Sequence, residues 1–262
     1  MNDSMIRGAE IVIKSLVAEN ARYIFGYPGG AIMPVYDALY DYMDLIQHIL
    51  TRHEQGAIHA AQGYARVSGH VGVCMATSGP GATNLITGMA DALIDSTPLV
   101  CITGQVASHL LGTDAFQETD VVGISMPGTK WNIQVRNVND IAPAIAKGFH
   151  IARSGRPGPV LIDITKDAQT AMGEFNYVPC LNIRSYKPYP KVEDEAISKA
   201  AKLINEAQKP YVLYGQGTVI GNAEKELSAF LDKSGIPAAC TLLGTGALPE
   251  DHPSYVGKLG MH

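Results

Sequence analysis

The sequence has no cluster of basic residues, no closely paired cysteines and no long apolar run. Its 20 Lys and Arg are outnumbered by 25 Asp and Glu, so it lacks the concentrated positive charge that nucleic acid binding requires. The apolar stretches are short and broken by Gly, Pro or charge, and the first twenty residues lack the order of a secretory signal. We therefore expect a cytoplasmic protein without nucleic-acid or membrane partners.

The four cysteines stand singly, with no CxxC pair and no histidine at metal-ligand spacing. Cys74 and Cys101 lie inside apolar runs, which is typical of small buried side chains in a reducing compartment. The sequence thus predicts no metal site and no cysteine nucleophile.

Short apolar segments alternate with amphipathic ones along the first two thirds of the chain. Apolar periodicity predicts helices at 4–20, 33–42, 54–68, 82–94 and 139–152, the first with Ser4 as its N-cap, and strands at 23–25, 45–49, 71–76, 99–103, 131–135 and 160–164. Such alternation predicts an α/β fold, a parallel sheet flanked by helices, in which ligands bind at the carboxyl ends of the strands. The long polar stretch 104–128 is expected to be a functional loop.

The domain organisation follows from a change in composition. Residues 1–168 are expected to form one domain, and 169–190, rich in proline and polar residues, a linker. A second α/β unit begins at 191, with helices at 193–207 and 223–233 and strands at 211–214 and 237–240. Because residues 191–262 are fewer than a typical domain contains, we expect only the first part of that domain, and hence a fragment.

Two glycine-rich turns, at 26–30 and 78–84, flank Glu54 at similar distances. Each turn is explained either by tight backbone geometry alone or by a ligand packed against the backbone. Glu54 begins an apolar helix, where the helix dipole favours a carboxylate and poor hydration suits proton exchange with a weakly basic ring nitrogen. No lysine follows the glycines as in a P-loop, and the GxGxxxG at 215–221 fits a dinucleotide site only loosely.

Six ordered blocks together carry a resemblance that no single turn provides. They are FGYPGGA at 25–31, RHEQGA at 52–57, AQGYAR at 61–66, TSGPGATN at 77–84, GTDAFQE at 112–118 and GRPGP at 155–159. In this combination the chain resembles, over its whole length, the catalytic large subunits of acetolactate (acetohydroxyacid) synthases. These enzymes depend on thiamine diphosphate, decarboxylate pyruvate and join the product to a second 2-oxoacid, giving 2-acetolactate or 2-aceto-2-hydroxybutyrate in branched-chain amino acid (isoleucine and valine) biosynthesis.

The resemblance implies that 1–168 is the pyrimidine-binding domain and 191–262 the first part of a central FAD-associated domain. The family's magnesium and diphosphate motif begins Gly-Asp-Gly, and none of the 27 glycines here is followed by Asp. The C-terminal diphosphate-binding domain, which would anchor thiamine diphosphate and Mg²⁺, is therefore expected to be absent. We expect the chain alone to bind that cofactor weakly and to be inactive.

The resemblance also implies residue roles. Glu54 matches the glutamate that hydrogen-bonds the aminopyrimidine ring, Gly30 the glycine whose backbone approaches the reacting centre, and Gln117 a donor to the oxyanion of the oxoacid. Phe116 and Lys166 match residues at the substrate and its channel. The matched cofactor contacts are Pro80 and Asn84 for the pyrimidine, and Arg156, Gly215, Gln216, Gly217, Thr241, Leu242, Met261 and His262 for FAD.

By the same resemblance Glu54 acts across a subunit interface, in a homodimer or homotetramer, with a regulatory small subunit as a further partner. Two alternatives remain: a related decarboxylase or carboligase, such as glyoxylate carboligase or pyruvate oxidase, and a non-catalytic module that dimerises or binds FAD. Glu54 counts against glyoxylate carboligase, and the block at 112–118 against pyruvate oxidase. One departure is Ala107, where many family members have proline at the channel mouth, so an altered response to channel-blocking inhibitors is expected.

Overall fold

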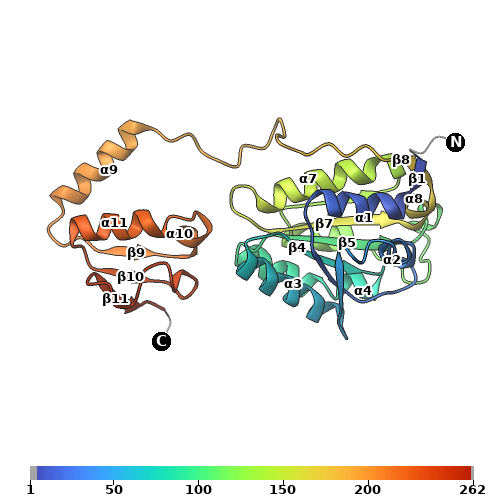
Figure 1. The fold of residues 1–262 in the computed structure, drawn as a ribbon, viewed down its shortest axis with the longest axis horizontal. Helices are drawn as coiled ribbons and strands as arrows, with labels where there is room; N and C mark the ends of the chain where they lie inside the picture. The colour runs from blue at the N-terminus through green and yellow to red at the C-terminus, as the bar shows by residue number, and fades with distance from the viewer. Residues whose placement is uncertain (1–4, 261–262) are drawn as a thin grey trace. The chain divides into compact units, whose positions relative to one another are not determined.

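The computed structural model describes residues 5–260 of the chain. It consists of two compact units, Met1–Pro190 and Lys191–His262 (Figure 1). Each unit has its own sheet and its own hydrophobic core, so each is described by itself.

The first unit contains a six-stranded sheet in the order β3-β2-β4-β5-β7-β6, and every neighbouring pair in it is parallel. The predicted parallel α/β fold is therefore confirmed. The strands are β2 (Tyr23–Gly26), β3 (Gln47–Leu50), β4 (Gly72–Ala76), β5 (Leu99–Gln105), β6 (Trp131–Val135) and β7 (Pro159–Thr165). The helices are α1 (Gly8–Ala18), α2 (Met33–Tyr40), α3 (Glu54–Ser68), α4 (Pro80–Thr83), α5 (Ile86–Ile94), α6 (Val121–Ser125), α7 (Ile141–Arg153) and α8 (Lys166–Thr170), with 3₁₀ turns Ser108–Leu110, Met126–Gly128 and Val138–Asp140.

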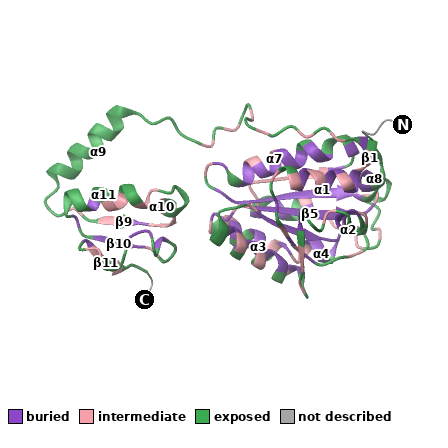
Figure 2. Cartoon of the chain, viewed as in Figure 1, coloured by how far each residue is buried: buried purple, intermediate pink, exposed green. Residues whose placement is uncertain are grey.

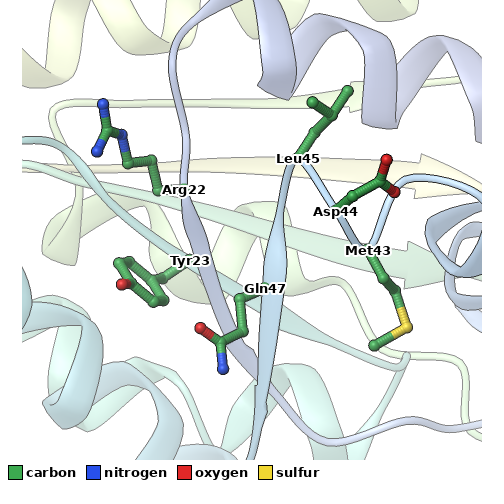
Figure 3. A pocket seen from close by; sticks show the side chains of 6 residues that line it. All are labelled: Arg22, Tyr23, Met43, Asp44, Leu45 and Gln47. Carbon is green, nitrogen blue, oxygen red and sulfur yellow. The ribbon is translucent and has the colours of Figure 1, made fainter.

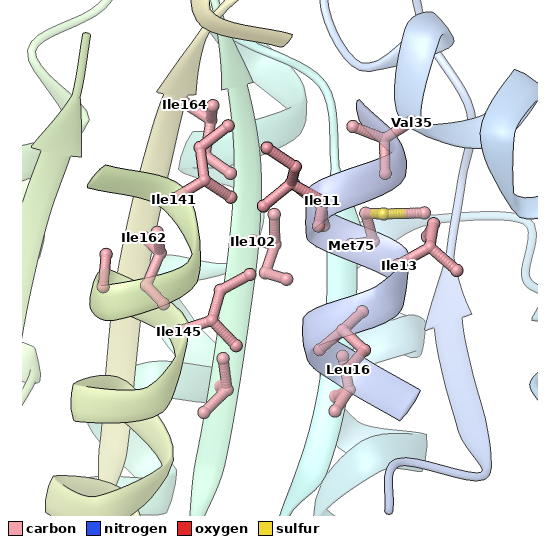
Figure 4. Close-up of a cluster of buried hydrophobic side chains, with 14 of the residues drawn as sticks. Ile11, Ile13, Leu16, Val35, Met75, Ile102, Ile141, Ile145, Ile162 and Ile164 are labelled. Atoms are coloured by element: carbon pink, nitrogen blue, oxygen red, sulfur yellow. The ribbon is translucent and has the colours of Figure 1, made fainter. Parts of the chain in front are cut away.

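Alternate side chains of the central strands enter two separate cores, because successive residues of a strand face opposite sides of a sheet. In β4, Val73 and Met75 join the cluster beneath α1, α2 and α7, whereas Cys74 and Ala76 join the one formed with α3 and α5. Figure 4 shows the first cluster, where isoleucines of α1 and α7 meet those of β5 and β7. Strands β4, β5 and β7 are buried throughout (Figure 2). Cys74 and Cys101 are buried free thiols, as predicted.

The chain start differs from the predicted helix at 4–20. Residues Met5–Arg7 form β1, which pairs antiparallel with β8 (Met172–Glu174), and the helix begins only at Gly8. A Cβ on Gly8 would lie 2.0 Å from the carbonyl oxygen of Ala168, so the backbones of α1 and α8 approach too closely for a side chain. Helical periodicity does not reveal a strand whose partner lies more than 160 residues away. Ser4, the expected N-cap, lies outside the described residues.

Part of the stretch expected as a linker, 169–190, packs against the first unit. After β8, Phe175 and Tyr177 pack against the first core cluster, and the hydroxyl of Tyr186 donates to the carbonyl oxygen of Ser154 at 3.1 Å. Ile183 is the third side chain of this stretch that is partly buried against the first core cluster.

The second unit is a smaller α/β layer. Its sheet has the order β11-β10-β9 and is parallel, with strands β9 (Val212–Tyr214), β10 (Ala238–Cys240) and β11 (Tyr255–Lys258). Its helices are α9 (Asp194–Glu206), α10 (Gln216–Ile220) and α11 (Glu224–Ser234), with a 3₁₀ turn at Leu242–Gly244. Its core consists of Tyr214, Leu231, Ala238, Cys240, Ala247 and Leu248. No residue of α9 is buried (Figure 2).

Across residues 5–260, none of the helices combines the length and the apolar character that crossing a membrane would require.

Candidate functional site

Glu54 is the first residue of α3, which follows β3 at the carboxyl edge of the sheet. Its side chain is 9% exposed, so the carboxylate is largely removed from water. Two features offset that cost: the unpaired N–H groups at a helix start favour a negative charge there, and a neighbouring amide donates to it. His53 caps the helix by accepting the N–H of Gln55 on Nδ1 at 3.1 Å, which fixes where α3 begins.

The turn after β4 joins Glu54 directly. Asn84 Nδ2 donates to Glu54 Oε2 at 3.0 Å, across 30 residues of sequence. At Gly81 a Cβ would lie 2.7 Å from Thr77 Cγ2 and 3.3 Å from Glu54 Oε1, so a side chain there would crowd the carboxylate. Pro80 is exposed at the start of α4. The helix start at Glu54 and the glycine-rich turn at 78–84, both singled out in the sequence, are therefore in direct contact.

The glycine-rich turn after β2 packs against Thr77, the residue that also lies beside Gly81. The Ala31 N–H donates to Thr77 Oγ1 at 3.1 Å, and a Cβ on Gly29 would come within 2.6 Å of Thr77 Cβ. Gly30 differs from Gly29, because a Cβ placed there meets nothing within 4 Å. Packing within this chain thus explains Gly29 and gives no reason for Gly30.

The loop after β5 brings residues 112–118 to the site. Gln117 has a φ of 58°, and its carbonyl oxygen would lie 2.6 Å from a Cβ on Gly79, whose own φ is 55°. The backbone of Gln117 therefore rests on the turn that carries Pro80 and leads to Asn84. The side chain of Phe116 is 87% exposed.

Glu118 closes this loop by accepting the backbone N–H groups of Gly112, Thr113 and Ala115. Hydrogen bonds from these groups, Gly112 first, lower the pKa of Glu118. Because an ionised carboxylate accepts these bonds more strongly than a neutral carboxyl group, the loop is held together best when Glu118 is charged.

The remaining predicted residues of the first unit are placed apart from Glu54. Lys166 is exposed at the start of α8, directly after the carboxyl end of β7. Arg156 precedes β7, at the amino edge of the sheet, where its guanidinium donates to Ser96 Oγ and to the Ile94 carbonyl, both at 2.8 Å. It thereby satisfies the carboxyl end of α5.

In the second unit the predicted residues gather at the carboxyl ends of β9 and β10. Gly215 ends the turn after β9, and its Cβ would lie 3.1 Å from Thr241 Oγ1. Gln216 and Gly217 begin α10, and Leu242 is 77% exposed. Met261 and His262 lie outside the described residues.

A buried polar cluster next to the site was not predicted. Asp163, fully buried in β7, accepts hydrogen bonds from Thr103 Oγ1 at 2.7 Å and from the side-chain amides of Gln105 and Gln134 at 3.1 Å each. Burial raises the pKa of Asp163, and these hydrogen bonds oppose that rise. The signal in the sequence was an acid inside the otherwise apolar run PVLIDI, which needs buried partners wherever it folds.

A cavity of about 530 Å³ is lined by Arg22, Tyr23, Met43, Asp44, Leu45 and Gln47 (Figure 3). It lies at the amino ends of β2 and β3, the opposite edge of the sheet from Glu54, and contains none of the predicted residues. Within residues 5–260, no three His, Cys, Asp or Glu side chains are grouped to hold a metal ion.

Comparison with known proteins relates both units to one family. The description "Thiamine pyrophosphate enzyme, N-terminal TPP binding domain" matches residues 6–124, and "Thiamine pyrophosphate enzyme, central domain" matches 197–262. The large subunit of acetolactate synthase from Corynebacterium glutamicum is 53% identical over 255 residues, covering 97% of this chain and 41% of that protein. The isozyme 2 large subunit from Escherichia coli is 50% identical over 258 residues, covering 98% and 46%. The chain spans less than half the length of these relatives.

Proposed function

The chain belongs to the thiamine pyrophosphate enzymes, and we propose that it supplies the pyrimidine-binding side of an acetolactate synthase active site. The reaction is the decarboxylation of pyruvate and its condensation with a second 2-oxoacid, giving 2-acetolactate or 2-aceto-2-hydroxybutyrate. The observation that carries this proposal is the buried carboxylate of Glu54, which Asn84 holds at the junction of two glycine turns.

The residues at this junction fit the aminopyrimidine half of thiamine diphosphate. A proton acceptor is present with little access to water, and Gly30 exposes backbone that packing within the chain does not cover. Bound thiamine diphosphate supplies the electron sink for decarboxylation, and the protein supplies position and proton control.

Glu54 is the group that holds or releases a proton at the pyrimidine ring nitrogen. Asn84 fixes the direction of that carboxylate by donating to Oε2. Pro80, exposed beside Asn84, offers an apolar contact to the ring. The low exposure of Glu54 keeps bulk water from competing for its proton.

Substrate contacts are assigned to the loop at 112–118 and to the end of β7. The side-chain amide of Gln117 donates to the oxygen of the 2-oxoacid where negative charge develops. The exposed ring of Phe116 offers an apolar cover, and the exposed ammonium of Lys166 attracts the carboxylate of an incoming oxoacid.

In the second unit we assign Gly215, Gln216, Gly217, Thr241 and Leu242 to FAD. The approach of Gly215 to Thr241 at the carboxyl ends of β9 and β10 favours this assignment, because ligands of parallel α/β sheets bind at the carboxyl ends of the strands. Mg²⁺ and the diphosphate are assigned to protein outside the residues of this chain. A homodimer or homotetramer in the cytoplasm is the proposed assembly. Relatives named as large subunits favour a regulatory small subunit as a further partner.

The test uses a hybrid enzyme in which this chain replaces the aligned region of the C. glutamicum relative, to which it is 53% identical. Acetolactate formation from pyruvate is measured. We expect an active hybrid that loses on the order of 10² to 10⁴ in rate on Glu54→Gln, which keeps size but removes the acceptor. Glu174→Gln, at an exposed position of β8, is the matched control and leaves the rate unchanged. A hybrid in which both variants retain full activity would refute the role of Glu54.

A further inference from the structure

Asp163 has an environment that the proposed chemistry does not use. It lies in the middle of β7 with no exposed surface, and three donors from the two neighbouring strands converge on its two oxygens. Thr103 donates a hydrogen bond to Oδ1, whereas Gln105 and Gln134 both donate to Oδ2 at 3.1 Å. A buried carboxylate with three donors is a fixed acceptor, because releasing any donor would leave a polar group unpaired.

Gln105 differs from Gln134 in what else its amide contacts. Its Nε2 also donates to the carbonyl oxygen of Thr119 at 2.9 Å, and its Oε1 accepts the N–H of Val106 at 2.9 Å. The backbone donor and the backbone acceptor fix which end of the amide is which. With 1% exposure, Gln105 is a rigid bridge from the end of β5 to the far end of the site loop.

Thr119 follows directly on the segment that Glu118 closes. The bonds from Gly112, Thr113 and Ala115 to Glu118 make residues 112–118 one compact loop, and Gln117 rests on Gly79. A hydrogen bond at Thr119 therefore determines where this whole loop sits relative to the turn that leads to Asn84 and Glu54.

We propose that Gln105 is a positioning residue which, braced by Asp163, holds the loop 112–119 on the Gly79 turn and thereby places Gln117 at the site. The position of the loop is independent of any activity, whereas the consequence for Gln117 rests on the proposed function. Gln105 does not touch the substrate in this proposal and acts only through the loop.

Gln134 provides an unusually close control. It is the same residue type, donates to the same oxygen of Asp163 at the same 3.1 Å, and lies on the neighbouring strand β6. Its side-chain amide reaches no part of the loop among the residues described. Replacing either glutamine by methionine, which has a similar length and no donor, removes one bond to Asp163 and the bond that the amide oxygen accepts, from the Val106 N–H in Gln105 and from Arg136 Nε in Gln134. Only Gln105→Met also removes the bond to Thr119.

The experiment measures hydrogen exchange of the amides at 112–119 in this chain. We expect exchange in Gln105→Met to be on the order of five-fold faster than in the wild type, with Gln134→Met unchanged at those amides. If Gln105→Met does not fold, Asp163→Asn replaces it, because loss of the charged acceptor weakens the brace on Gln105 and leaves the bond from the Val106 N–H in place; faster exchange at 112–119 is again expected. Equal acceleration in the Gln105 and Gln134 variants, or none in either, would overturn the proposal.

A second arm uses the active hybrid enzyme described above. There Gln105→Met is expected to lower kcat/KM and to be non-additive with Gln117→Ala, since both act through one contact. Additive losses would show that Gln105 does not act through Gln117. An inactive hybrid would count against the proposed function, and the exchange measurement would still decide the role of Gln105.

Discussion

Gly29 and Gly30 are adjacent glycines for which the structure predicts opposite responses to the same substitution. A Cβ on Gly29 would lie 2.6 Å from both Cβ and Cγ2 of Thr77, a 92% buried, β-branched residue with little freedom to move. Overpacking of this kind costs about 1–3 kcal/mol. Displacing Thr77 also weakens the bond that its Oγ1 accepts from the Ala31 N–H, about 1 kcal/mol. Gly29→Ala should thus lower the free energy of unfolding by about 2–4 kcal/mol in total.

Gly30→Ala should leave stability unchanged or raise it slightly. A Cβ there meets nothing within 4 Å, and Gly30 is not among the glycines with positive φ. Removing a glycine at a compatible position restricts the unfolded chain and contributes up to about 1 kcal/mol. In the hybrid enzyme the same substitution should abolish most activity, because the added methyl group faces the proposed reacting centre.

The assay is urea unfolding of the chain, followed by circular dichroism, with the two variants compared at the first transition. A Gly30→Ala variant as unstable as Gly29→Ala would show that packing within the chain, not a bound group, requires Gly30. Full activity of Gly30→Ala in the hybrid would refute its assignment to the reacting centre even if stability behaved as expected.

Three other predictions concern the loop, its entrance and the core. Because backbone hydrogen bonds lower the pKa of Glu118, its stabilisation of the loop is present above the ordinary glutamate pKa and is lost as the pH falls through the lower folded value. The protection factors of the amides at 112–118, which correct exchange for its intrinsic dependence on pH, should fall across that window. Glu118→Gln should remove this change in protection. Ala107 has a φ of −61°, which proline adopts without strain, so Ala107→Pro should raise the free energy of unfolding by about 0.4–1 kcal/mol. A lower free energy of unfolding in calorimetry would contradict this. Phe149 lies in α7 and is 1% exposed, so Phe149→Ala should lower the free energy of unfolding by about 3–5 kcal/mol, which is measured as a fall in Tm. A fall in Tm of less than about 2 °C would show that neighbouring side chains fill the cavity.

Much of the first unit was predictable because its signals are local. Strands such as β4 and β7 are short apolar runs between turns, and α3 begins at the predicted residue, where His53 provides the cap. The start of α1 was misplaced, and β8 was missed, because the β1–β8 pair joins segments more than 160 residues apart. The linker at 169–190 was predicted from composition alone, which gives no sign that Phe175 and Tyr177 are partly buried against the first core cluster.

By itself the sequence determined the alternation of strands and helices from β2 to β7, the parallel α/β architecture and the candidate Glu54, since periodicity, turn residues and ordered motifs are properties of neighbouring residues. Only the tertiary structure decided which of those residues meet. It joined Asn84 to Glu54 across 30 positions, separated the role of Gly30 from that of Gly29, and placed Gln105 between Asp163 and Thr119. The physical reason is that a parallel sheet gathers the ends of distant strands at one edge, and the hydrogen bonds made there depend on register and packing, which no short stretch of sequence encodes.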